Sequence, residues 1–583
     1  MDQLAPPNGA KFDRAVATTF ALDLTATLLP ALAFTGFHLA SGTSDPIATL
    51  ESIRSTADRI DVFCQAGAIG VPEKSPDLLA FLEPMVHPVR PPSSHGLFHP
   101  KVWFIRYVDD AGPPSYRLLV LTRNLTMDSS WDLAVRLDSE SIAKKTQPAS
   151  AALRDFLVSL PDRATPSLSG ARRKAISELA DEAGRIVWEL PPSAEQAVLH
   201  YLNPNRKRST DFSGARHLVV SPFVDAAGLS RIRPKGEIQI LSRAEELEKL
   251  ETVTTSRLKA RVLDELAVSQ EVEGSRLGGQ LHAKMYVVEQ SQNWSKSHVF
   301  IGSANATGAA FTNNTEFLVE IRGHKNHFGI ERFLGDDGTF MAMTEPYQPT
   351  EAEVDEAEDA LQRELENAVR RVAGMTFSVE VISSGTDDTH DLHLTSEKPF
   401  SLEPGWHATV ELLTLPEHGA PVGPGVALDT VVPAVPTPDI TPFLAIRVVS
   451  PTGLLASTVV VAALINEPKD RLDVVLARQM DSPDKFLRFL FFLLSLGKPA
   501  ALVDRASTRS TGTGGASPFG EGGSGVLEMV LGALATRPEA LADLDALVAR
   551  LEGTEAGRKA LPEGFSEFWS VVRDAATANK ELA

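Results

Sequence analysis

The fold of this chain is decided by the sequence QLHAKMYVV at residues 280–288, together with FIGSAN at residues 300–305. The pattern predicts a strand, a turn and a second strand. It places His282 and Lys284 on one face, because side chains two residues apart in a strand point the same way. The second strand delivers Ser303 and Asn305, and Glu316 follows. An imidazole, an ammonium, an amide and a carboxylate gathered in one place suit a phosphodiester.

The same arrangement occurs earlier, as HPKVWFI at residues 99–105 and LLVLTRN at residues 118–124, followed by Asp132. The step from His to Asn is 25 residues in the first copy and 23 in the second, and the step from His to the acid is 33 and 34. One His-x-Lys match would be weak evidence. Recurrence of the whole set, with an apolar strand and an Asn at nearly equal spacing, predicts an internal duplication.

Bulk composition indicates a multidomain protein. The chain has 583 residues, which predicts three or four domains, and its 43% apolar and 23% charged content is ordinary for a globular protein. The single cysteine, Cys64, excludes an internal disulfide framework and fits a reducing compartment. No basic leader with an apolar core is evident, so we expect the cytoplasm and no membrane segment. The net charge of −20 does not attract polyanions, so a nucleic-acid substrate requires basic residues concentrated at a cleft, or a partner.

The order of the predicted elements repeats. The first half predicts a helix at 47–58, strands at 60–66, 101–108 and 117–123, and helices over 140–215. The second half predicts strands at 217–220 and 237–241 and a helix at 244–267 before His282. We therefore expect an α/β fold with two pseudo-symmetric lobes, at residues 1–190 and 191–349, each with a mixed sheet flanked by helices. The site should lie at the seam between them.

The remainder of the chain changes character. Residues 350–373 predict a solvated helical linker, rich in acids. Residues 374–466 alternate short apolar runs with Pro- and Gly-rich turns, which predicts a small β-sandwich or barrel. Residues 467–583 predict a helical domain interrupted by a flexible loop at 506–525. No catalytic constellation follows residue 350, so we interpret this part as an interaction module.

The paired set suggests a division of roles. One neutral imidazole attacks phosphorus, and the other protonates the leaving oxygen. The charged and amide groups then stabilise the phosphoryl oxygens, and the acids fix the tautomer of an imidazole. The candidate catalytic residues are His99, Lys101, Asn124, Asp132, His282, Lys284, Asn305 and Glu316. Ser303 is a candidate substrate-binding residue that would donate a hydrogen bond to the phosphate. No metal or cofactor is required, because the lysines supply the positive charge. Each residue also has a simpler structural interpretation, as a strand edge, a cap or a surface charge.

This double motif resembles the two halves of a phospholipase D superfamily enzyme, over roughly residues 15–345. The pattern is closest to bacterial phospholipase D-like nucleases and tyrosyl-DNA phosphodiesterases. In the familiar pattern an Asp stands five residues after the Lys, whereas this chain has Arg106 and Glu289 there. The resemblance implies that His99 is the nucleophile, that His282 is the acid, and that the reaction passes through a phosphohistidine.

Three functions follow as hypotheses. The first is a cytoplasmic, metal-independent nuclease, acting on DNA in preference to RNA. By analogy it would serve bacterial anti-phage defence or restriction, with a helicase or ATPase partner bound through residues 374–583. The second is a phospholipid-hydrolysing enzyme. The third is a non-catalytic DNA-binding or assembly subunit. The sequence leaves open whether the chain is a monomer or a homo-oligomer.

Overall fold

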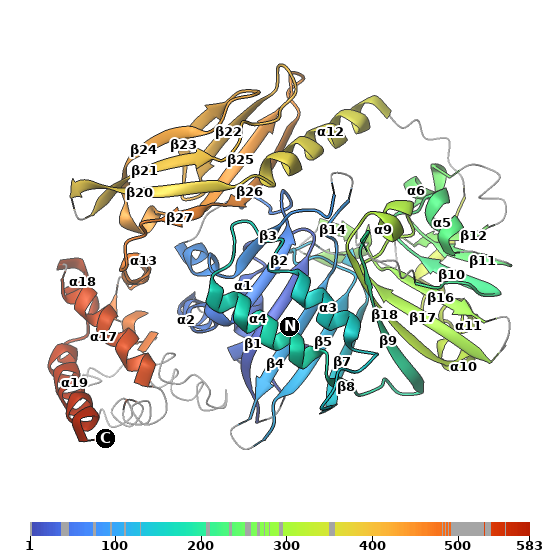
Figure 1. Ribbon diagram of the computed structural model, residues 1–583, viewed down its shortest axis with the longest axis horizontal. Helices are drawn as coiled ribbons and strands as arrows, with labels where there is room; N and C mark the ends of the chain where they lie inside the picture. Colours follow the sequence, from blue (N-terminus) through green and yellow to red (C-terminus); the bar gives the residue numbers. More distant parts are fainter. Residues whose placement is uncertain are drawn as a thin grey trace.

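The structure of the protein is a computed structural model. It describes residues 3–7, 9–35, 46–73, 77–93, 96–109, 112–128, 130–205, 210–232, 236–250, 258–264, 269–272, 275–278, 280–290, 295–348, 356–386, 388–480, 482–483, 485–487, 489–490, 530, 538–553 and 555–582. The fold is mixed α/β, with two mixed sheets side by side and further β-rich sheets above them (Figure 1).

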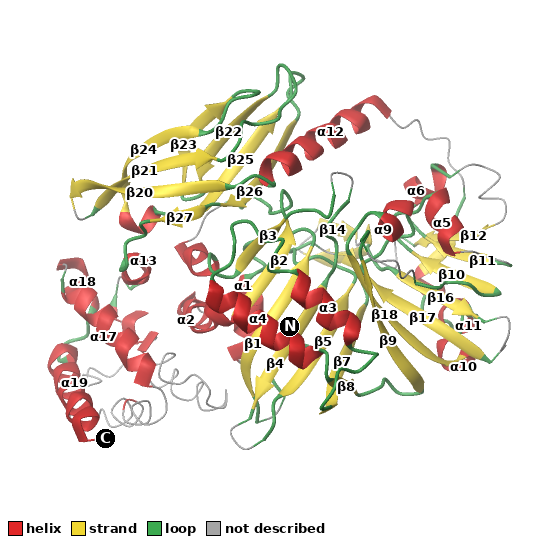
Figure 2. Cartoon of the chain, viewed as in Figure 1, coloured by secondary structure: helices red, strands yellow, loops and turns green. Residues whose placement is uncertain are grey.

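The first lobe is a seven-stranded sheet in the order β3-β2-β1-β4-β5-β7-β8. Its strands are β1 (Lys11–Thr19), β2 (Ile60–Gln65), β3 (Val86–Val89), β4 (Val102–Val108), β5 (Ser115–Leu121), β7 (Ala134–Ile142) and β8 (Ile186–Trp188). Alternate side chains of β1 enter different cores. Ala15 and Ala17 pack with α1 (Leu28–Thr35) and α2 (Pro46–Thr56), whereas Val16 packs with α3 (Ala151–Ser159) and α4 (Gly170–Ala183). Both faces are therefore covered, as a buried mixed sheet requires (Figure 2).

The second lobe is an eight-stranded sheet in the order β19-β12-β11-β10-β16-β17-β18-β9. Its strands are β9 (Ala194–Leu202), β10 (Arg216–Val220), β11 (Ile238–Leu241), β12 (Leu258–Leu263), β16 (Met285–Glu289), β17 (Lys296–Gly302), β18 (Glu316–His324) and β19 (Thr344–Pro346). Its helices are α5 (Ala226–Ile232), α6 (Ala244–Glu248), α9 (Gly308–Thr312), α10 (Lys325–Phe328) and α11 (Glu331–Leu334). A separate hairpin is formed by β13 (Ser269–Val272) and β14 (Ser275–Gly278).

The duplication extends to the register of the strands. In each lobe a central strand pairs in parallel with the next strand along the chain and antiparallel with the strand after the His-x-Lys motif. Thr18 faces Val102 in the first lobe, and Val220 faces Met285 in the second. Following these pairs outward makes β1, β2, β3, β4, β5 and β7 equivalent to β10, β11, β12, β16, β17 and β18. Every position near the motif in one lobe thus has a defined counterpart in the other.

The two lobes are joined by reciprocal backbone pairs at the seam. The short strand β15 (Gln280–Leu281) pairs in parallel with β6 (Ser130–Trp131) of the first lobe. The counterpart is a parallel bridge between Phe98 and Thr315. The backbone N–H of His282 donates to Trp131 O at 3.0 Å, and that of His99 donates to Thr315 O at 2.9 Å. Each His is therefore anchored by the backbone of the other lobe.

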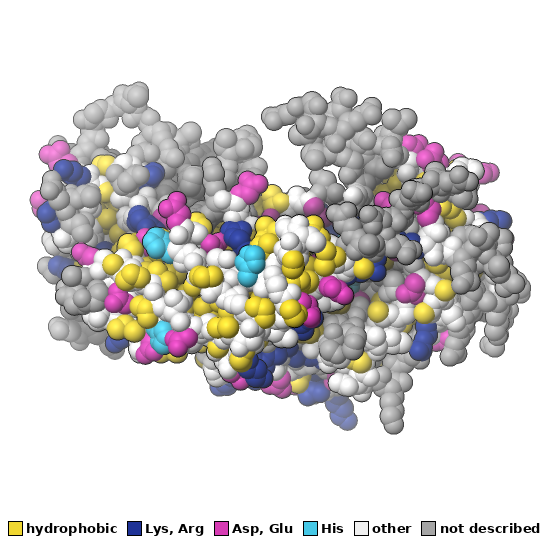
Figure 3. All heavy atoms as spheres, turned by 90° about the horizontal axis from the view of Figure 1, so that it is seen from above, with side chains coloured by type: hydrophobic (Ala, Val, Ile, Leu, Met, Phe, Trp, Pro, Cys, Tyr) yellow, Lys and Arg dark blue, Asp and Glu magenta, His cyan; other side chains and the backbone are white. Residues whose placement is uncertain are grey.

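The β-rich domain, whose strands lie between Phe377 and Ile465, is above the first lobe (Figure 1). It contains two four-stranded sheets, β24-β21-β20-β27 and β23-β22-β25-β26. The strands are β20 (Phe377–Thr386), β21 (Thr389–Ser396), β22 (His407–Leu412), β23 (Leu415–Val422), β24 (Asp429–Pro436), β25 (Phe443–Val449), β26 (Leu455–Val461) and β27 (Ala463–Ile465). Seen from above, its surface is largely hydrophobic or uncharged (Figure 3), and Val426 and Val431 are among its exposed side chains.

This domain docks on the loop that follows β2. Thr458 Oγ1 and the backbone N–H of Val459 both donate to Ile69 O, at 3.0 and 2.9 Å. Helix α12 (Glu356–Ala373) packs on β25 and β26. Arg370 of this helix also lies against Gly67 of the first lobe, where a Cβ would be only 2.8 Å from the Arg370 Cα. Gly67 also has φ of +85°, a conformation that favours glycine.

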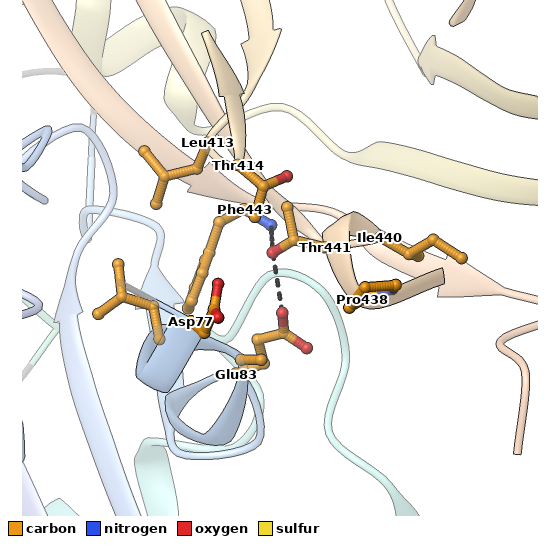
Figure 4. A pocket seen from close by; sticks show the side chains of 10 residues that line it. Asp77, Glu83, Leu413, Thr414, Pro438, Ile440, Thr441 and Phe443 are labelled. Atoms are coloured by element: carbon orange, nitrogen blue, oxygen red, sulfur yellow. Dashed lines mark hydrogen bonds between the residues drawn. The ribbon is translucent and has the colours of Figure 1, made fainter. Parts of the chain in front are cut away.

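The C-terminal helices α13 (Arg471–Gln479), α17 (Pro538–Glu552), α18 (Glu555–Ala560) and α19 (Phe565–Leu582) follow. The side chain of Arg471 forms a buried ion pair with Glu83 of the first lobe. Burial nevertheless raises the pKa of Glu83 to about 7. Glu83 lines a pocket between the first lobe and the β-rich domain, where Thr441 donates to it (Figure 4), away from the paired motifs. Within the described ranges, no helix is long and apolar enough to cross a membrane.

The structure corrects several predicted elements. Residues 194–202 and 258–263, both assigned to helices, form β9 and β12. Strand β9 is at one edge of the second sheet and β12 is next to the other edge, and the pattern of each resembles a half-buried helix. The helix at 356–373 is not simply solvated, since Leu365, Val369 and Val372 are buried against the β-rich domain. The loop expected at 506–525 lies outside the described residues. The domain bounds stay a prediction.

A buried carboxylate ties α4 to the first sheet, and we expect it to dominate the acid stability of this lobe. Asp61 accepts hydrogen bonds from Arg172 Nη1 at 2.6 Å and from Arg14 Nη1 at 2.9 Å. His87 Nε2 lies 3.0 Å from the same carboxylate. Burial opposes ionisation of Asp61, but His87 and Arg172 lower its pKa to about 2. The ionised form therefore contributes about 2 kcal/mol above about pH 4, and this is lost as pH falls through the folded pKa.

The substitution Asp61→Asn should reduce the free energy of unfolding by roughly 3–5 kcal/mol, because it leaves buried cations without a countercharge. Urea unfolding at pH 7 measures this. Asp58→Asn is the matched control, because Asp58 also meets Arg172, at 3.3 Å, but is exposed. Equal effects of the two substitutions would contradict the assignment.

Candidate active site

The His-x-Lys motifs lie just before strands β4 and β16, in extended segments outside the strands themselves. Our expectation that both residues lie within a strand was therefore wrong, but the side chains still gather. Lys284 Nζ lies 3.5 Å from His282 Nδ1 and donates to His282 O at 2.7 Å. In the first lobe, Lys101 Nζ donates to His99 O at 3.0 Å. Each ammonium is thus held against the backbone of its own His.

The carboxylates act across the seam. His99 Nδ1 lies 2.9 Å from Glu316 Oε2, although His99 belongs to the first lobe and Glu316 to the second. Reciprocally, His282 Nδ1 of the second lobe lies 3.3 Å from Asp132 Oδ1 of the first. Contact through Nδ1 leaves Nε2 of each ring as the nitrogen for chemistry. Neither lobe alone contains an oriented imidazole.

Each carboxylate is held by a matching hydroxyl and a matching neighbour. Ser303 Oγ donates to Glu316 Oε2 at 2.5 Å, and Asn314 Nδ2 donates to Oε1 at 3.0 Å. In the other half, Asp132 accepts from Thr122 Oγ1 at 3.3 Å and from Ser130 Oγ at 2.5 Å. Ser303 was expected to donate to phosphate. Its proton is instead directed to Glu316, because the side chain is fully buried behind that carboxylate.

Sequence reasoning did not single out Thr122, Ser130 or Asn314. A signal was available, since Thr122 and Ser303 both stand two residues before the motif Asn, and Ser130 and Asn314 both stand two residues before the acid. Phe20 was also missed, and its ring lies 5.3 Å from that of His99.

The two lysines place concentrated positive charge at the seam. Lys101 and Lys284 are buried, and Lys284 Nζ also donates across the seam to Thr122 O at 3.3 Å. Burial lowers the pKa of Lys101 to about 7, and burial together with the charge of Lys101 lowers the pKa of Lys284 strongly. Two buried ammonium groups whose charges repel form a site that an anion would stabilise.

The imidazoles are held neutral. Burial lowers the pKa of His99 to about 4 against the opposing effect of Glu316, and burial also lowers the pKa of His282. His99 is the more enclosed ring, with 10% of its side chain exposed against 16% for His282. Neutral His99 with Nδ1 bound to a carboxylate has the form of a nitrogen nucleophile. Within the described part of the chain, no cluster of three or more His, Cys, Asp or Glu residues is arranged to hold a metal.

The motif asparagines flank this group unequally. Asn124 Oδ1 accepts from the backbone N–H of Ala21 at 3.4 Å. Asn305 Oδ1 is buried and has no hydrogen-bond partner among the residues that the structure describes. The positions five after each Lys have structural roles, since Arg106 pairs with Asp13 and Glu182, and Glu289 Oε1 accepts from Ile330 N at 3.0 Å.

We expect anion binding to be coupled to proton uptake. At pH 8 a Lys101 of pKa about 7 is largely neutral, and a bound anion raises that pKa and draws in about one proton. At pH 5.5 the group is already protonated and uptake should shrink. Calorimetric titration with inorganic phosphate in buffers of different ionisation enthalpy measures the uptake. Lys101→Met should reduce the uptake at pH 8. A proton uptake by the wild type that is the same at pH 8 and at pH 5.5 would contradict the assignment.

Comparisons with known proteins give the following similarities. Residues 226–332 match a family model described as cardiolipin synthase, PLD-like domain. No curated protein matches the chain. A mutant of yeast tyrosyl-DNA phosphodiesterase aligns with 14% identity over 56% of this chain and 84% of that chain, with a TM-score of 0.34. Phosphatidylserine synthase of Haemophilus influenzae Rd KW20 aligns with 11% identity over 63% of this chain and 89% of that chain, with a TM-score of 0.33.

Proposed function

We propose that this chain, which contains a phospholipase D-like domain, is a phosphodiesterase that cleaves nucleic acid through a phosphohistidine. The observation that carries the proposal is the reciprocal orientation of two imidazoles by carboxylates from opposite lobes, beside two buried lysines. Such a group holds a nucleophile, an acid and charge compensation in fixed positions. Proximity and preorganised electrostatics supply most of the catalysis of phosphoryl transfer.

The proposed reaction has two steps. Nε2 of neutral His99 attacks phosphorus, and the bond to the leaving oxygen breaks as His282 donates its proton to that oxygen. In the second step neutral His282 removes a proton from water, which attacks phosphorus and releases His99 with a phosphomonoester product. His282 must be protonated before the first step. The pKa of this ring, lowered by burial, is raised when the anionic substrate arrives beside it.

The lysines and asparagines complete this scheme. Lys101 and Lys284 would balance the charge on the phosphoryl oxygens that do not react, and the amides of Asn124 and Asn305 would donate to them. The carboxylates would keep both rings in the required tautomer and stabilise whichever ring is positive.

The proposal is tested with labelled single- and double-stranded DNA and RNA in the presence of EDTA. Wild type should cleave at least one polymer, and His99→Ala and His282→Ala should not. Phosphatidylcholine micelles in a parallel assay address the phospholipid alternative, and turnover of micelles alone would overturn the nucleic-acid assignment. Roles in defence, a helicase or ATPase partner bound through residues 374–583, and a cytoplasmic location stay predictions.

A further inference from the structure

The register equivalence between the lobes reveals where their symmetry is broken around the site. Thr19 and Ser221 are equivalent, because each hydroxyl accepts from the residue after the motif Asn, at 3.0 and 2.9 Å. Each also donates to the carbonyl two residues on, at 2.7 and 2.6 Å. That carbonyl belongs to Ala21 in the first lobe and to Phe223 in the second. A small side chain is thus replaced by a large aromatic one, and residue Phe223 is 39% exposed.

A second difference lies next to the first. Gln65 in the first lobe and Arg243 in the second occupy equivalent positions, two residues beyond Phe63 and Leu241 in the paired strands. Gln65 Oε1 accepts from Phe98 N, just before His99, at 2.7 Å. Arg243 instead donates Nε and Nη2 to Leu281 O, just before His282, at 3.1 and 3.0 Å. The carbonyl partner brings no countercharge, and the charges that act on Arg243 from its own side are those of Glu245 and Glu246.

Phe223 and Arg243 form one unit at the seam. The Arg243 guanidinium carbon lies 5.0 Å from the centre of the Phe223 ring, which is a cation–π distance. The charge of Arg243 also reaches Lys284, whose pKa it helps to lower. The unit is tied to His282 through Leu281 and to Asn305 through the bridge between Val224 and Ala306.

The first lobe contributes a second arginine to the same side. Arg123 stands where the second lobe has Ala304, between the motif hydroxyl and the motif Asn. Its Nε lies 3.7 Å from Asp132 Oδ2, the carboxylate that orients His282, and 37% of its side chain is exposed. Both added guanidiniums therefore contact groups next to His282, namely Leu281 O and Asp132. The His99 side has Ala21 and Gln65 at the counterpart positions, and its own aromatic ring, Phe20, lies against His99.

We propose that Phe223, Arg243 and Arg123 form a binding site for the nucleotide on the leaving-group side of the scissile bond. The base stacks on Phe223, and its flanking phosphate lies near the two guanidiniums. The proposal rests on the function above, in which His282 protonates the leaving oxygen. A stacked base and a second phosphate are features of a nucleic-acid leaving group, which a choline or ethanolamine headgroup lacks.

The test compares two single-stranded oligonucleotides that differ only in a base or an abasic spacer just beyond the scissile phosphate. Wild type should prefer the base-containing substrate by about tenfold or more in kcat/KM, since stacking of one base is worth about 1–3 kcal/mol. In Phe223→Ala, which installs the first-lobe residue, the ratio should fall to about one. Leu190→Ala is the matched control, because Leu190 is 40% exposed in the turn between β8 and β9, and it should keep the wild-type ratio.

A second variant tests the charge. Arg243→Gln installs the other first-lobe residue and should reduce the salt dependence of oligonucleotide binding by about one unit of slope. Hydrolysis of bis(4-nitrophenyl) phosphate by wild type reports the proposed phosphodiesterase activity separately. If wild type cleaves this diester and both oligonucleotides without preferring the base, the leaving-group site is overturned while the function stands. If wild type cleaves none of them, the function itself fails. An unchanged ratio in Phe223→Ala also overturns the site.

Discussion

His99→Ala is expected to abolish both turnover and the covalent intermediate, whereas His282→Ala should abolish turnover but retain the intermediate. Steady-state activity on oligonucleotides should fall roughly 10⁴-fold or more in both variants, because each ring performs a step that the other cannot replace. The two differ when the leaving group needs no proton. With a nucleotide 4-nitrophenyl ester, His282→Ala should release one equivalent of nitrophenolate per enzyme and then stop, because water is no longer activated.

A stopped-flow burst measures this equivalent, and an alkaline gel with labelled substrate locates the phosphate on the enzyme. His200→Ala is the control, because His200 Nε2 contacts a carboxylate, Glu320, at 2.7 Å in the same lobe without belonging to the paired motifs. A burst in His99→Ala and none in His282→Ala would exchange the two roles. Wild type that turns over without any labelled protein would remove the covalent step altogether.

Glu316→Gln should lower kcat by roughly 10²–10⁴-fold with little change in KM, although the residue belongs to the lobe opposite His99. The amide keeps the shape of the side chain, but it cannot hold the Nδ1–H tautomer of His99 by charge or stabilise the ring as it becomes positive. Asp132→Asn should have a smaller effect, because its contact with His282 is longer, at 3.3 Å against 2.9 Å.

The matched control for Glu316 is Glu320→Gln. Glu320 lies on the same strand, β18, and contacts His200 and His298 at 2.7 Å each, but these rings are not part of the motif. Its substitution should leave kcat near wild type. A loss in Glu320→Gln as large as that in Glu316→Gln would indicate damage to the sheet and would contradict a specific action on His99. Thermal unfolding of each variant separates the two causes.

The reciprocal arrangement explains why the chain needs both lobes for a single site. The backbone pairs between Phe98 and Thr315 and between Leu281 and Trp131 fix each His against the other lobe. A shift of the lobes by one residue would separate both imidazoles from their carboxylates. The β-rich domain is connected to the His99 side of the site through two hydrogen bonds. Its Thr458 donates to Ile69 O, and the next residue, Gly70, donates its backbone N–H to Leu22 O, close in sequence to Phe20.

Much of this site could be predicted from the sequence by itself. The repetition of His-x-Lys, Asn and acid at nearly equal spacing is a local pattern, and it predicted the eight candidate residues together with an α/β fold that contains two mixed sheets. Strands β2, β10 and β11 were also predictable from local sequence, because a buried parallel strand appears as a short apolar run bounded by turn residues. The sequence also predicted that each acid fixes the tautomer of an imidazole, but it did not say which acid contacts which ring.

Only the tertiary structure decided that Glu316 serves His99 and that Asp132 serves His282. Spacing along a chain carries no information about which lobe a side chain faces. That depends on backbone pairs between distant segments, such as Phe98 with Thr315 and Leu281 with Trp131. Strands β9 and β12 were missed for a related reason. Their assignment depends on the neighbour to which each hydrogen-bonds, and a nine-residue segment with mixed polarity satisfies a helix equally well until that neighbour is present. Arg123 of the first lobe likewise comes to the His282 side only once the lobes are closed, because it pairs with Asp132, which contacts His282 across the seam.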